Sequence, residues 1–154
     1  MSIKEKSYVA GFLDGDGCIM AQLVRRKDYA LGYQIRTSIV FYQKNIHKEI
    51  LYWLMKKIKY GYIRDRKDGM FEYTIVGLKE TLKILNLLLP YLRLKKKVAK
   101  TVIKIIENHP KKLNKTALIR LSYLVDETAN YNYSKRRTIN SQIIIDFFEQ
   151  KSKT

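Results

Sequence analysis

Residues 8–17 constrain the fold of this chain more than any other stretch, because an apolar segment runs there directly into a glycine-spaced acidic segment. The bulk of its first half comes from three side chains, Val9, Phe12 and Leu13. Ala10 and Gly11 leave almost no side chain, so one face of a helix here would let another backbone approach closely. The pattern predicts a short helix over residues 7–13 with Ser7 as its N-cap.

Residues 14–17 read Asp-Gly-Asp-Gly and predict a tight turn after that helix, because glycine tolerates the backbone angles of a C-terminal cap. Carboxylates at a helix C-terminus face the negative end of the helix dipole, which is unfavourable by about 0.3–1 kcal/mol. The placement favours a compensating cation, and hard oxygen ligands suit Mg²⁺ or Ca²⁺. A polar turn without a ligand is the alternative. An EF-hand loop is excluded, because counting from Asp14 puts Arg25 where a bidentate glutamate is required.

The charge balance predicts a polyanionic partner. The 154 residues include 31 Lys and Arg against 14 Asp and Glu, a net charge of +17, which opposes compaction unless nucleic acid or a similar partner offsets it. An anionic membrane is the rival, but the sequence has no signal peptide, long apolar span or lipidation motif, so we expect neither membrane association nor secretion. A ribosomal protein would also be basic, although 46% hydrophobic residues is high for one.

Composition also limits the metal sites. Cys18 is the only cysteine, which rules out an internal disulfide and a cysteine-based zinc site. His47 and His109 are the only histidines, so we do not expect a histidine-ligated metal centre. The frequent Lys, Ile, Asn and Tyr have AT-rich codons, as in organelle genomes. We therefore expect a chloroplast or mitochondrial origin.

Hydrophobic periodicity predicts one α+β domain over residues 1–154. Residues 1–90 are expected to form an α-β-β-α-β-β-α core with a four-stranded antiparallel sheet and helices on one face, and residues 91–154 to form additional C-terminal helices. The expected elements after the first helix are strands 18–26 and 33–43, helix 45–59, strands 62–66 and 71–76, and helices 77–89, 95–108, 113–130 and 139–150.

The exposed face of the predicted sheet is rich in arginine and glutamine. By alternation it carries Gln22, Val24, Arg26, Gln34, Arg36, Ser38, Val40, Tyr62, Arg64, Arg66, Glu72 and Thr74. Arg and Gln pair bidentately with guanine and adenine edges, and a twisted β-ribbon fits the major groove of DNA. On these residues alone, a merely solvated face is an equal alternative.

Residues 9–17 closely resemble the LAGLIDADG motif of homing endonucleases over nine consecutive positions, with conservative replacements only. Residues 62–66 and 90–97 look like those of single-motif, intron-encoded members that act as homodimers. The resemblance implies a saddle-shaped sheet over the major groove of double-stranded DNA. It also implies a homodimer that cuts a long pseudo-palindromic target and thereby promotes intron mobility. The implied metal ion is Mg²⁺, and Mn²⁺ or Ca²⁺ could replace it in supporting DNA binding.

The same resemblance suggests roles for individual residues. Asp16 would be the metal-binding carboxylate, with the backbone oxygen of Gly15 as a further ligand. Gln43 would position the attacking water, and Lys95 would stabilise charge at the phosphate. His47 stands where the family has a basic residue. Further DNA contacts are expected from Lys97, Ser134, Lys135 and Arg137. A dimer interface is expected from Val9, Ala10, Gly11, Leu13 and Asp14, with Asp14 ordering that interface rather than binding metal.

Two other functions fit the resemblance: an RNA-binding intron maturase, and a DNA-binding regulator that has lost catalysis. The presence of Asp16, Gln43 and Lys95 together argues against an inactive regulator. The base-reading face argues against an exclusively RNA role, because A-form RNA hides its major groove.

Overall fold

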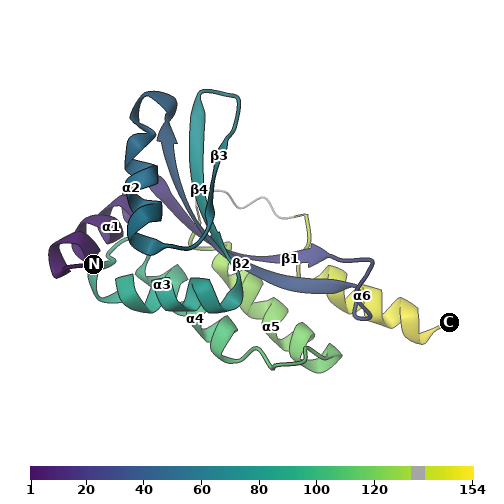
Figure 1. Ribbon diagram of the computed structural model, residues 1–154. Coiled ribbons are helices and arrows are strands. Elements are labelled where there is room, and N and C mark those ends of the chain that lie inside the picture. The colour runs from purple at the N-terminus through teal and green to yellow at the C-terminus, as the bar shows by residue number, and fades with distance from the viewer. Residues whose placement is uncertain (133–137) are drawn as a thin grey trace.

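The computed structural model describes residues 1–132 and 138–154, and its elements follow the expected order (Figure 1). The core elements are α1 (Ile3–Asp16), β1 (Gly17–Arg25), β2 (Tyr33–Lys44), α2 (Glu49–Ile58), β3 (Tyr62–Asp65), β4 (Met70–Val76) and α3 (Leu78–Leu88). The C-terminal helices are α4 (Lys96–Glu107), α5 (Lys115–Thr128) and α6 (Ser141–Ser152). Short 3₁₀ turns occupy Asn45–His47 and Leu89–Tyr91.

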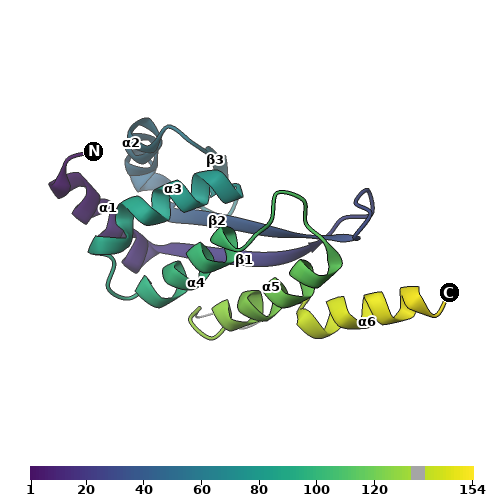
Figure 2. The same ribbon diagram turned by 90° about the horizontal axis from the view of Figure 1, so that it is seen from below.

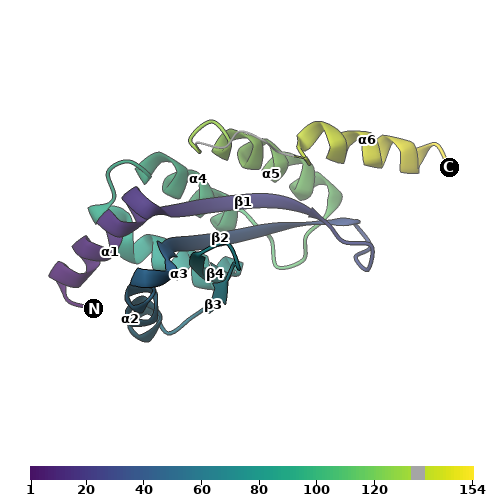
Figure 3. The same cartoon turned by 90° about the horizontal axis from the view of Figure 1, so that it is seen from above.

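The four strands form one antiparallel sheet in the order β1-β2-β4-β3. Helices α3, α4 and α5 cover the face seen from below (Figure 2), and the face seen from above carries none of them (Figure 3). The sheet is bent: in Figure 1, β3 and β4 point upwards and the β1–β2 hairpin extends to the right. The open side of this bend faces away from α3, α4 and α5.

Alternation along the strands places the core as predicted. Ile19, Ala21 and Leu23 of β1 are buried, as are the alternate residues of β2 from Tyr33 to Phe41. Phe41 stacks on Tyr73 of β4, with ring centroids 6.0 Å apart. The Tyr73 hydroxyl donates a hydrogen bond to the carbonyl of Tyr60, and burial raises the pKa of this phenol. The α+β core is therefore confirmed.

Helix α1 is longer at both ends than residues 7–13. Ser2 caps it rather than Ser7: the Ser2 hydroxyl accepts from the Glu5 N–H at 3.1 Å, and the Glu5 carboxylate accepts from the Ser2 N–H at 2.9 Å. This capping box starts the helix early and leaves Ser7 in its interior. The helix continues to Asp16, so most of the acidic segment is helical, and its C-cap Gly17 is extended (φ −129°) rather than left-handed.

The segment after β2 also differs from the expected single helix over 45–59. Asn45 begins a 3₁₀ turn and does not cap a helix, and α2 starts only at Glu49. The turn leaves Ile46 79% exposed, whereas the helical period of a helix over 45–59 would bury this residue. Lys59 ends α2 in the left-handed conformation (φ 69°).

Candidate active site and nucleic-acid interface

The end of α1 is tied to the loop that enters α4. The carboxylate of Asp14 accepts hydrogen bonds from the backbone N–H of Arg93 at 2.8 Å and of Lys95 at 2.9 Å. The ammonium of Lys95 donates in return to the Asp14 carbonyl at 2.5 Å. Both side chains are 9% exposed. Asp14 is thus occupied in holding backbone together, and it brings Lys95 to the last turn of α1.

Asp16 and Gly15 are exposed at this same helix end. Their carbonyls belong to the last four of α1, which have no partner further along the helix. Gln43 is half-buried near the end of β2, two residues beyond the pairing of Phe41 with Gly17. Its side-chain oxygen accepts the Lys44 N–H at 3.0 Å. The fold therefore gathers the ends of α1 and β2 and the start of α4 at one corner.

The donor set at this corner fits a hard divalent cation. Asp16 offers a carboxylate and Gly15 a carbonyl, the oxygen ligands that Mg²⁺ and Ca²⁺ prefer. Among residues 1–132 and 138–154, no group of three or more His, Cys, Asp or Glu side chains is placed to enclose a metal. Mg²⁺ usually keeps several waters and takes the rest of its shell from substrate phosphates, so two protein oxygens per chain are compatible with it.

Three of the five residues expected at a dimer interface lie in the chain's own core. Val9, Ala10 and Leu13 are 0% exposed in the single chain, so they have no surface to offer a second copy. The reason is that this face of α1 packs on its own sheet. Gly11 is exposed, and a Cβ built on Gly11 would meet nothing within 4 Å. The accessible small-residue stripe runs along Ser7, Gly11 and Gly15.

Strand register places the predicted base-reading positions on one face. Gln22 pairs with Arg36, and Val24 with Gln34. On the other side, Val40 pairs with Thr74, Thr74 with Tyr62, and Glu72 with Arg64. Ser38, Val40 and Thr74 are at most 5% exposed. They lie at the base of this face, and their side chains do not project from it. The same face also carries three residues that the sequence analysis missed, although the alternation, continued towards the strand ends, includes them. Cys18 pairs with Val40, Met20 with Ser38, and Tyr42 with Glu72.

Carboxylates accompany most of the arginines on this face. The ion pairs are Arg26 with Asp28 at 2.8 Å, Arg64 with Glu72 at 2.6 Å and Arg66 with Asp68 at 3.0 Å. Arg36 differs, because its Nε is buried and has no hydrogen-bond partner within the part of the chain that the structure describes. The acids hold three exposed guanidinium groups in defined positions.

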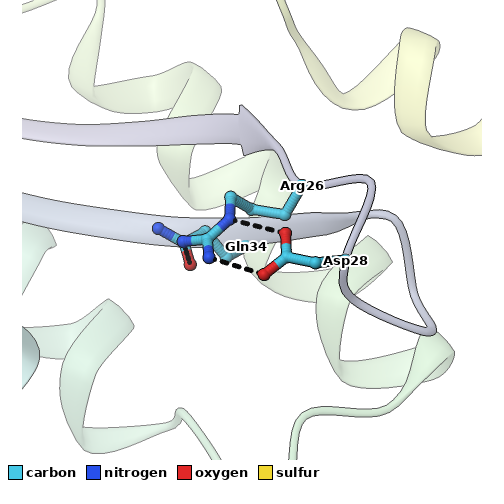
Figure 4. A network of polar contacts seen from close by, with 3 residues as sticks. All are labelled: Arg26, Asp28 and Gln34. Atoms are coloured by element: carbon cyan, nitrogen blue, oxygen red, sulfur yellow. Dashed lines mark hydrogen bonds and ion pairs between the residues drawn. The ribbon is translucent and has the colours of Figure 1, made fainter.

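The Arg26 contacts form a small network (Figure 4). Its Nε and one terminal nitrogen donate to the two oxygens of Asp28 at 3.0 and 2.8 Å, and its other terminal nitrogen donates to the Gln34 side-chain oxygen at 3.1 Å. Hydrogen bonds from Arg26 and the backbone N–H of Asp28 hold the pKa of the Asp28 carboxyl below its usual value. Sequence reasoning missed Asp28, although its spacing of two from Arg26 was readable.

The remaining predicted site residues are either exposed or outside the described residues. Lys97 is exposed in the first turn of α4, and His47 is exposed at the end of the first 3₁₀ turn. Ser134, Lys135 and Arg137 lie outside the described residues. Within the described ranges, no helix has the length and apolarity needed to cross a bilayer.

A family comparison accounts for this arrangement. The family model described as LAGLIDADG endonuclease matches residues 9–106. The chain belongs to the LAGLIDADG endonuclease family. The matched region runs from the LAGLIDADG motif in α1 through the whole sheet and most of α4.

Individual LAGLIDADG relatives match nearly the whole chain. DNA endonuclease I-CvuI of Chlorella vulgaris is 40% identical over 133 residues, 86% of this chain and 83% of that protein. DNA endonuclease I-CreI of Chlamydomonas reinhardtii is 34% identical over 151 residues, 96% and 92% of the two chains. A crystal structure of I-CvuI with the I-CreI target and Mg, in which the DNA is not cleaved, matches with a TM-score of 0.93 and 36% identity, covering 97% of this chain and 95% of that one. A second I-CvuI structure, with its own target and Ca, matches equally well.

Proposed function

We propose that this chain is a site-specific homing endonuclease that cuts both strands of a long, pseudo-palindromic DNA target as a homodimer with divalent metal. The observation that carries the proposal is the corner where α1 ends with exposed Asp16, beside the end of β2 that carries Gln43 and the start of α4 that carries Lys95. This corner adjoins an uncovered sheet face lined with arginine and glutamine. The DNA complexes of I-CvuI, a relative that shares this fold, support the same assignment.

In the proposed site, the Asp16 carboxylate and the Gly15 carbonyl would hold Mg²⁺, which would supply charge neutralisation and activated water at the scissile phosphate. Gln43 would orient the attacking water. Because its side-chain oxygen accepts the Lys44 N–H, its amide NH₂ is the group available to the water oxygen. Lys95, anchored to the Asp14 carbonyl, would place positive charge beside the phosphate as negative charge develops there.

The homodimer follows from the count of acidic groups. Each chain offers one Asp16, whereas a double-strand break requires two cleavage sites. We propose that two copies pack through the Ser7–Gly11–Gly15 stripe of α1, whose small side chains allow the helix backbones to approach closely. A two-fold axis at this contact brings both Asp16 residues to the centre of the target and requires a roughly palindromic sequence.

We further propose that Mg²⁺ is the working ion and that the gene lies within an intron of a chloroplast or mitochondrial genome, where cleavage would promote intron mobility. The hard-oxygen ligand set supports the ion. The abundance of residues whose codons are AT-rich and the relatives from Chlorella vulgaris and Chlamydomonas reinhardtii support the setting.

Selection of cleaved duplexes from a randomised DNA library in Mg²⁺ tests the proposal. We expect recovery of long, pseudo-palindromic sites and no products when Mg²⁺ is removed. Sites without two-fold symmetry would contradict the homodimer, and binding without cutting would favour a regulator. Recovery of RNA but not DNA from a parallel RNA pool would favour a maturase.

A further inference from the structure

Adjacent arginines at the end of β1 serve opposite faces of the sheet. Arg25 lies under the hairpin, where its guanidinium sits 5.1 Å from the Tyr33 ring centroid and 4.9 Å from that of Phe147, and donates to the Gly32 carbonyl at 2.5 Å. Arg26 contacts Gln34 on the open face. Arg25 is therefore part of the packing between the hairpin and α6, and Arg26 is free of that role.

Asp28 fixes the orientation of the Arg26 guanidinium by binding one whole edge of it. The contact is bidentate, from Nε and one terminal nitrogen to the two carboxylate oxygens, at 3.0 and 2.8 Å. This geometry is directional as well as charged. The Asp28 contact leaves one N–H of the terminal nitrogen that it binds, and both N–H groups of the other terminal nitrogen, unused.

Two further contacts restrict the same group. The Gln34 side-chain oxygen accepts from the other terminal nitrogen at 3.1 Å, and the Tyr29 ring centroid lies 4.5 Å from the guanidinium carbon. Yet the arginine side chain is still 37% exposed on the open face. Figure 4 shows Asp28 beside the guanidinium at the base of the hairpin loop, and Gln34 on the neighbouring strand. An exposed arginine held on three sides loses little conformational entropy when it meets a ligand.

The presence of Asp28 is costly for a protein that binds a polyanion. Only 14 residues of the chain are acidic, and Asp28 is 65% exposed beside the face that would receive phosphates. A carboxylate there repels DNA of every sequence. A benefit to selectivity explains why such a group stands beside a base-reading arginine.

We infer that Asp28 is a positioning residue for sequence readout, holding Arg26 so that its remaining N–H groups select guanine in an outer base pair of each half-site. The inference rests on the proposed DNA-binding function and deepens it. Arginine pairs bidentately with O6 and N7 of guanine, and such a pair discriminates by about 1–3 kcal/mol, or roughly 5- to 150-fold. Gln34, with its oxygen used by Arg26, keeps only its amide donors for the neighbouring base.

The test measures base preference rather than affinity alone. The best site from the randomised library is synthesised with each of the four bases at every position, and binding is measured in Ca²⁺ without Mg²⁺ for the unsubstituted chain and for R26A, D28A, D28E and R26A/D28A. We expect R26A to identify one base pair per half-site at which guanine preference is lost. D28A should lose preference at that same pair at least fivefold, while binding the other sequences as well as or better than the unsubstituted chain.

The controls separate positioning from charge and from folding. D28E should keep most of the preference, because a longer carboxylate can still bind the same edge, and D28A in an R26A background should change no base preference further. D68A is the matched variant, because Asp68 pairs with Arg66 at 3.0 Å in the turn between β3 and β4, and it should leave the Arg26 base pair unchanged. Tighter binding of D28A to all sequences with an unaltered preference profile would overturn the inference while leaving the endonuclease proposal intact. Absence of selective DNA binding by the unsubstituted chain would overturn both.

Discussion

Asp14 and Lys95 are joined twice, in opposite directions. The Asp14 carboxylate accepts the backbone N–H of Lys95 at 2.9 Å, and the Lys95 ammonium donates to the backbone carbonyl of Asp14 at 2.5 Å. The pair closes the gap between the end of α1 and the start of α4, which are 81 residues apart in sequence. The first carboxylate of the LAGLIDADG motif is therefore structural in this chain, and the second, Asp16, is left exposed.

Replacing Asp14 with asparagine should destabilise the fold. The carboxylate accepts two backbone N–H groups, from Arg93 and Lys95, one on each oxygen. Asparagine keeps one acceptor oxygen and replaces the other with an amide NH₂ donor, so one of the two N–H groups loses its acceptor. A buried donor left without its acceptor costs about 1–3 kcal/mol. Urea unfolding followed by circular dichroism would measure the loss, and unchanged stability would show that these bonds contribute nothing net.

Replacing Asp16 with asparagine should have the opposite profile. The side chain is exposed at the end of α1, so the free energy of unfolding should change little. Cutting in Mg²⁺ should be abolished, because the carboxylate is the proposed metal ligand, while DNA binding measured without Mg²⁺ should remain within a few-fold of that of the unsubstituted chain. Loss of binding in parallel with cutting would assign Asp16 a structural role instead.

Replacing Gly11 with leucine should separate folding from assembly. A Cβ at this helical position meets nothing within 4 Å of the single chain, and leucine favours helix over glycine by up to about 1 kcal/mol. The monomer should therefore be no less stable, whereas two α1 helices packed through this stripe would be forced apart. Sedimentation should show a dimer for the unsubstituted chain and a monomer for the variant, with cutting lost.

A dimer that survives this substitution would place the contact elsewhere. Ser7→Leu provides a second probe on the same stripe, one helical turn away. Tyr123→Ala, at an exposed position of α5 (55%), is the control that should leave assembly unchanged.

Two glycines of the acidic segment should respond with opposite signs to alanine. A Cβ on Gly17 would lie 2.5 Å from Leu13 Cδ1 and 2.9 Å from the Leu13 carbonyl oxygen, and Leu13 is fully buried. Overpacking of this kind costs about 1–3 kcal/mol. Gly15 has nothing within 4 Å, so Gly15→Ala should gain up to about 1 kcal/mol from helix propensity. Thermal unfolding of both variants would check the contrast, and equal effects would contradict it.

The reason that position 17 requires glycine could not be predicted from the sequence. Alternation and helical period placed every strand and helix of the core, because each needs only its own apolar face. The glycines suggested a left-handed cap, but Gly17 is required by the closeness of Leu13, a contact that depends on the turn from α1 into β1. Likewise the burial of Val9 and Ala10 reflects which side of α1 meets the sheet, and a short amphipathic pattern did not specify that side.

For the candidate site, the family resemblance named Asp16, Gln43 and Lys95, and the fold brings their elements to one corner. The partners that orient the exposed arginines were not foreseen. Asp28 and Asp68 lie in loops, where their contacts depend on loop geometry rather than on any periodic pattern. The residue types predicted a sheet face rich in arginine and glutamine. Which guanidinium groups are paired with a carboxylate became clear only from the three-dimensional structure.

Replacing Arg64 with alanine should produce two separable losses. Arg64 pairs with Glu72 at 2.6 Å across β3 and β4. Its removal would delete a proposed base-reading side chain and also leave a carboxylate unpaired on the proposed DNA-binding face. The first effect should cost about 1–3 kcal/mol at particular base pairs. The second should weaken binding to all sequences, because Glu72 then repels phosphates. In R64A/E72Q the uniform part should be recovered and the base-specific part should persist, as measured by binding to duplexes varied one position at a time. Full recovery of the unsubstituted profile by the double variant would show that Arg64 only neutralises Glu72 and reads no base.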